Sequence, residues 1–142
     1  MFSPRASRAR RRAAWTLVAA YAALVAYMSL RRFGSSPIDR AIDHVGRAYF
    51  HLPAYAGLAG LLVLTLRTKG SLLRRSGWAF LIATGYGWAL EVAQIAAPTR
   101  SFNVQGLLFD AAGAAAGALA GLAYTAWRTR KGTRASAPTH TS

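Results

Sequence analysis

The chain lacks cysteine, so it contains no disulfide, no thiolate metal ligand and no cysteine nucleophile. Acidic residues are scarce as well, with 4 Asp and Glu against 18 Lys and Arg in 142 residues. The H-E-x-x-H motif of zinc proteases and the G-x-S-x-G motif of serine hydrolases are both absent. We therefore predict no metal and no cofactor, and an enzyme is the less favoured of the functional hypotheses below.

Apolar sequence, in contrast, is abundant, since 54% of the residues are hydrophobic. A helix needs about 20 apolar residues to cross about 30 Å of hydrocarbon. Four stretches approach this length, at residues 13–30, 49–66, 78–97 and 104–127. The sequence therefore predicts an all-α, polytopic membrane protein built as a bundle of four transmembrane helices.

The basic residues indicate how these helices cross the membrane. Thirteen of the 18 fall in the predicted tails at 1–12 and 128–142 and in the turn at 67–75, which a four-span chain places on one side. Segments rich in Lys and Arg remain in the cytoplasm. We expect a membrane domain at 13–127 in the cytoplasmic membrane, with both basic tails inside. The net charge of +14 is then a topology signal, and no nucleic-acid partner is expected.

An alternative for the N-terminus is a cleaved signal peptide, because Arg10, Arg11 and Arg12 precede an apolar run and small residues. The run is longer than a typical signal-peptide core, and its removal would leave an odd number of spans. It would also break the charge asymmetry. We expect an uncleaved first helix.

Several polar side chains interrupt the apolar stretches at one depth. Glu91 and Gln94 are three residues apart near the outer end of the third span, so they share a helix face. Asp110 lies equally deep in the fourth span, roughly 9 Å from its outer end. A charge at the bilayer centre costs at least ~2.5–3.5 kcal/mol, so an ionisable residue in a span indicates a functional site by default.

Three further residues complete a predicted polar cluster. His51 and Tyr55 are one turn apart at the outer start of the second span, and Arg100 lies in the short loop between the third and fourth spans. The predicted cluster is His51, Tyr55, Glu91, Gln94, Arg100 and Asp110.

A structural role stays open for each of these residues. His51 is then an interfacial side chain bonded to a loop, and Tyr55 is an ordinary bundle aromatic. Glu91 is protonated by burial or paired with Arg100 or His51, and Asp110 shares a proton with it.

The fourth span also carries glycines at a four-residue interval, Gly113, Gly117 and Gly121. Small residues at this spacing let a neighbouring helix approach closely. We favour another span of the same chain as that neighbour, and a homodimer through this glycine stripe is the alternative.

Taken together, these residues resemble the VanZ-like membrane protein family over about residues 47–122. The resemblance rests on His51-x-x-x-Tyr55-x-x-Leu58, Glu91-x-x-Gln94, Pro98-x-Arg100-Ser101-Phe102 and Asp110-x-x-Gly113. The chain departs from the family pattern at Arg47 and Gly106, where acidic residues are usual, and at Asp110, where Asn is typical.

The resemblance implies a four-helix integral membrane protein whose relatives are associated with low-level resistance to the glycopeptide teicoplanin. We expect membrane lipids as partners, and an outward-facing polar cluster that binds a lipid-linked envelope precursor or an amphiphilic antibiotic. A resistance-like role follows by analogy only. One alternative is an intramembrane enzyme that acts on a lipid headgroup, with Glu91 as acid or base and Arg100 on the phosphate. Another is a small transporter, which the apolar cytoplasmic halves of the second to fourth spans disfavour.

Overall fold

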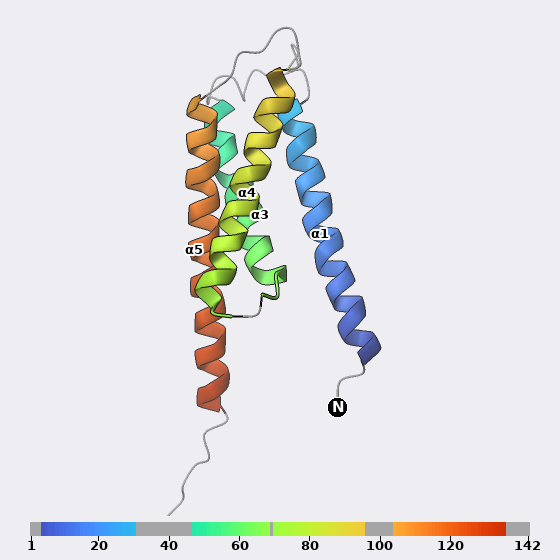
Figure 1. The fold of residues 1–142 in the computed structure, drawn as a ribbon. Helices are drawn as coiled ribbons and strands as arrows, with labels where there is room; N and C mark the ends of the chain where they lie inside the picture. Colours follow the sequence, from blue (N-terminus) through green and yellow to red (C-terminus); the bar gives the residue numbers. More distant parts are fainter. Residues whose placement is uncertain (1–3, 31–46, 69, 96–103, 136–142) are drawn as a thin grey trace, which may run out of the picture.

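The computed structural model describes residues 4–30, 47–68, 70–95 and 104–135. These residues contain no strand and form four helices: α1 (Pro4–Leu30), α3 (Arg47–Thr65), α4 (Leu72–Ile95) and α5 (Val104–Ala135) (Figure 1). The predicted all-α fold of four helices is therefore confirmed. Successive helices run in opposite directions, so α3 and α5 both begin at the upper end of Figure 1, and α1 begins at the lower end.

The helices agree with the predicted spans to within two residues at the upper end, and α1, α4 and α5 are longer than predicted at the lower end. α1 begins at Pro4, α4 begins at Leu72 and α5 continues to Ala135, each beyond the apolar stretch of its sequence. The described parts of the predicted tails at 1–12 and 128–142 are thus helical. Arg, the most frequent residue of these extensions, has high helix propensity, so the helices need not end where the apolar residues do.

A short turn holds α3 and α4 side by side. Gly70 has a φ of 131°, a conformation that residues with a Cβ rarely adopt. Ser71 is the N-cap of α4, where its Oγ accepts a hydrogen bond from the backbone nitrogen of Arg74 at 3.3 Å. Arg75 Nη2 donates to the carbonyl oxygen of Leu64 at 3.1 Å, which satisfies an acceptor in the last turn of α3.

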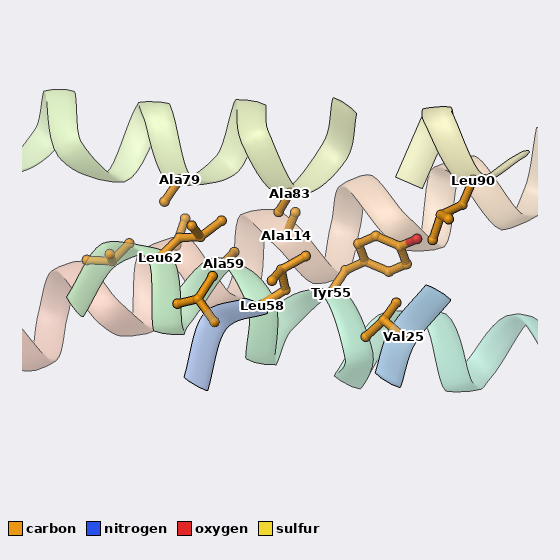
Figure 2. Close-up of a cluster of buried hydrophobic side chains, with 12 residues drawn as sticks. Val25, Tyr55, Leu58, Ala59, Leu62, Ala79, Ala83, Leu90 and Ala114 are labelled. Carbon is orange, nitrogen blue, oxygen red and sulfur yellow. The ribbon is translucent and has the colours of Figure 1, made fainter. Parts of the chain in front are cut away.

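The apolar core lies where α3 faces α4 and α5, as Figure 2 shows. Leu58 and Leu62 of α3 are buried among small side chains of the two neighbours, namely Ala79 and Ala83 of α4 and Ala114 of α5. Large residues on one helix opposite small residues on the next allow the helices to pack closely.

Two hydrogen bonds join α1 and α4. Tyr86 Oη donates to the carbonyl oxygen of Ala22 at 2.7 Å, and Gln94 Nε2 donates to that of Ser29 at 3.2 Å. The second acceptor lies in the last turn of α1, where carbonyl groups have no helical partner. In the described residues α1 packs on α3 and α4 and makes no close backbone approach to α5.

Large apolar side chains are exposed on the outside of every helix. They include Leu17 and Leu24 of α1, Leu52 of α3, Leu81 and Val92 of α4, and Leu108 and Leu119 of α5. A soluble monomer rarely exposes contiguous apolar surface on this scale.

Two of the described helices are long and apolar enough to cross a membrane, α1 over Ser7–Leu30 and α5 over Val104–Gly132. Only 11% and 39% of their apolar windows are buried in the protein, whereas the core helix of a soluble protein is mostly buried. α3 is apolar over the shorter segment Tyr49–Thr65. α4 contains Glu91 and Gln94, which lower its mean hydropathy.

Candidate functional site

A hydrogen-bonded pair of ionisable side chains lies at the upper end of the bundle. His51 Nδ1 of α3 and Asp110 Oδ1 of α5 are 2.7 Å apart. The Asp110 side chain is 1% exposed and the His51 side chain is 21% exposed. The carboxyl group is therefore enclosed, and the imidazole reaches from it to the surface.

The carboxylate determines which nitrogen of His51 carries a proton. When Asp110 is ionised it only accepts hydrogen bonds, and Nδ1 of His51 is then the donor. In the neutral ring, the lone pair then resides on Nε2. Such a ring can accept a proton or a hydrogen bond from a polar group at the upper end, and Asp110 holds it in one orientation.

Two neighbours complete the surroundings of Asp110. The Tyr55 ring is 1% exposed and stacks on the His51 ring, with 6.1 Å between centroids and 13° between planes. Asp110 Oδ2 has no hydrogen-bond partner in the described part of the chain. It faces Gly87 of α4, where an added Cβ would lie 2.6 Å from Oδ2 and 3.0 Å from Tyr55 Cε1. The absence of a side chain at Gly87 makes room for the carboxyl group.

Glu91 is buried one turn above Gly87 on the same face of α4, with 4% of the residue exposed. Four residues of helix rise about 6 Å, and α4 runs antiparallel to α3, so Glu91 lies near the level of His51. Across the described residues, no hydrogen bond or ion pair joins Glu91 to His51 or Asp110. Four of the six predicted residues thus gather in one region: His51, Tyr55, Glu91 and Asp110.

The other two predicted residues have different positions. Gln94 donates to the Ser29 carbonyl oxygen and so connects α4 to α1 instead of reaching the His51–Asp110 pair. Arg100 lies outside the described residues. Of the two remaining departures from the family pattern, Arg47 is the first residue of α3 and Gly106 is buried in the first turn of α5.

The glycine stripe of the fourth span, Gly113, Gly117 and Gly121, is buried against α3 of the same chain. An added Cβ at Gly113 would overlap the carbonyl oxygen of Leu52, and one at Gly117 would overlap that of Ala56. The stripe therefore serves the intrachain packing that we favoured, and α3 covers the surface that a homodimer through it would use.

The sequence did not predict a role for Gly87, although the close approach of its backbone to Asp110 shapes the site. The available signal was its position four residues before Glu91, because the two share one helix face. Tyr86 was missed for a different reason, since its acceptor is a backbone carbonyl of α1 and no residue type marks such a partner. No group of three or more His, Asp or Glu side chains that could hold a metal ion occurs in the described ranges.

No protein-family model, curated protein or solved structure matches this chain.

Proposed function

We propose that this protein is a four-span, VanZ-like protein of the cytoplasmic membrane, with both termini in the cytoplasm and the His51–Asp110 pair near the outer surface. Exposed apolar side chains on all four helices support the membrane placement. The antiparallel order of the helices puts the basic ends of α1, α4 and α5 together, as the positive-inside rule requires.

The upper end then binds the polar head of a lipid-linked or amphiphilic envelope molecule. One observation carries this proposal: an enclosed carboxyl group, Asp110, orients an imidazole that is itself 21% exposed. Burying a carboxylate is costly, and here the enclosed Asp110 holds the exposed imidazole in one orientation. Glu91 adds a second carboxyl group near the same level. By analogy with the family, the protein has a glycopeptide-resistance-like role.

Native mass spectrometry of lipids retained by the detergent-purified protein tests the binding site. We expect wild type to retain a defined envelope lipid that Asp110→Asn loses. Leu62→Ala is the stability control, because it removes part of a buried core side chain in the lower half of the bundle and leaves the upper end untouched. Equal loss of the lipid from both variants, or no selective lipid in wild type, would show that the pair is only structural.

Growth inhibition tests the role that the analogy suggests. Expression of wild type in a teicoplanin-sensitive host is expected to raise the inhibitory concentration, and expression of Asp110→Asn at an equal level is not. An unchanged inhibitory concentration with wild type would reject the resistance-like role. The binding site would still be tested separately by the lipid experiment.

The second candidate is an intramembrane enzyme, which the orientation of His51 by Asp110 favours. In this case His51 Nε2 acts as base and Glu91 as acid on a lipid headgroup. Glu91→Gln would then keep the retained lipid and lose its turnover, which a headgroup-release assay measures. The enzyme candidate would be excluded if wild type shows no turnover of the lipid and Glu91→Gln no longer binds it.

A further inference from the structure

A hollow lies in the lower half of the bundle, away from the His51–Asp110 pair. It is an open apolar groove of about 660 Å³. Its lining comes mainly from α3 and α5, with Tyr21 from α1. Six of its residues carry the argument: Tyr21, Gly57, Gly60, Ala116, Ala120 and Tyr124. The groove exists because α1 packs on α3 without approaching α5.

The dimensions of the groove fit one leaflet of a bilayer. From Ala116 to Tyr124, α5 rises about 12 Å, close to half of the ~30 Å hydrocarbon thickness. The groove runs toward the lower end, which the positive-inside rule places in the cytoplasm. Its lining of glycine, alanine, leucine and tyrosine residues offers no hydrogen-bonding side chain except the two tyrosine hydroxyl groups.

Positive charge marks the lower end of the groove. The Arg128 guanidinium lies 6.0 Å from the centroid of the Tyr124 ring, one turn below the groove. Lys131 Nζ lies 4.4 Å from the centroid of the Trp127 ring. These cation–π contacts hold the two cations on α5, about 6 Å and about 10 Å beyond Tyr124 toward the lower end.

We infer that this groove binds an anionic phospholipid of the inner leaflet, with an acyl chain between α1 and α5 and the phosphate at Arg128 and Lys131. Anionic lipids are concentrated in the cytoplasmic leaflet, and each nearby Lys or Arg strengthens their binding about fivefold. The inference shares the membrane placement of the proposed function and is independent of its upper-end site.

The test is native mass spectrometry of the full-length protein with phosphatidylglycerol or with phosphatidylcholine that has the same acyl chains. We expect wild type to retain phosphatidylglycerol selectively. Replacing both Ala116 and Ala120 by Leu fills the groove and is expected to abolish this retention. Both alanines are exposed, so the core is not disturbed. Ala112→Leu with Ala123→Leu is the matched control, because these residues are equally exposed on α5 and lie outside the groove.

The headgroup contacts are tested separately. Arg128→Gln with Lys131→Gln is expected to lower phosphatidylglycerol retention by about 25-fold, the product of two basic contacts, and to leave phosphatidylcholine unaffected. Asp110→Asn should leave this retention unchanged, which separates the groove from the upper-end site. Equal retention of the two lipids by wild type would overturn the inference. The inference would also be overturned if the Ala116→Leu, Ala120→Leu variant still retained phosphatidylglycerol. A dimer that forms in wild type and is lost only in this variant would overturn it as well.

Discussion

At Asp110, one carboxyl oxygen bonds His51 and the other lies against the backbone of Gly87. Removing one partner of such a pair leaves an uncompensated buried charge, whereas removing both leaves none. We therefore expect His51→Leu to lower the free energy of unfolding in detergent by about 3–5 kcal/mol. Adding Asp110→Ala should recover part of this loss. A double variant less stable than both single variants would mean that the pair is not coupled.

A substitution at Gly87 tests the packing around the carboxyl group of Asp110 more directly. In Gly87→Ala the new methyl group would displace the carboxyl group of Asp110, so we expect a loss of about 1–3 kcal/mol. Gly85→Ala is the control on the same helix, because an added Cβ there meets nothing within 4 Å. Helix propensity should stabilise it by up to ~1 kcal/mol. Thermal unfolding followed by circular dichroism compares the two, and equal effects would contradict the close contact.

At the scale of the helix, the pairing of α3 with α5 depends on backbone contact. An added Cβ at Gly117 would overlap the carbonyl oxygen of Ala56, and a backbone atom cannot turn aside as a side chain can. We expect Gly117→Ala to lower the unfolding temperature clearly. Gly60→Ala should have little effect, because its Cβ would lie 3.6 Å from the carbonyl oxygen of Gly117, an ordinary contact. Unfolding temperatures in one detergent decide the outcome, and a stable Gly117→Ala would rule out the close packing.

The helices and their antiparallel succession were predictable from the sequence, because apolar length determines the helices and short polar turns determine the succession. The spacing of Gly113 and Gly117 predicted that a neighbouring helix approaches closely but did not predict which helix. Small residues allow a short distance between helices and do not select the neighbour. The side-chain positions at Glu91 and Gln94 show a similar limit. A common helix face is wide enough for one residue to point into the bundle and for the other to reach α1.

At the scale of the whole molecule, the basic residues of the lower end predict one orientation in the membrane. The absence of native cysteine allows this to be tested with single engineered thiols. In intact cells, a membrane-impermeant maleimide should label Ser35→Cys, which lies in the loop predicted outside. It should label Ser142→Cys only after permeabilisation.

Labelling at these two sites and the intact mass together separate the competing topologies. Labelling of Ser142→Cys in intact cells would indicate an odd number of spans after a cytoplasmic N-terminus, as exclusion of α4 from the membrane would produce. Cleavage of the first helix would leave both labelling results unchanged. The hydrogen bonds from Tyr86 and Gln94 to α1 argue against cleavage, because the loss of α1 would leave these side chains without their acceptors in hydrocarbon. An intact mass that includes residues 13–30, measured on the same purified protein, would exclude cleavage directly.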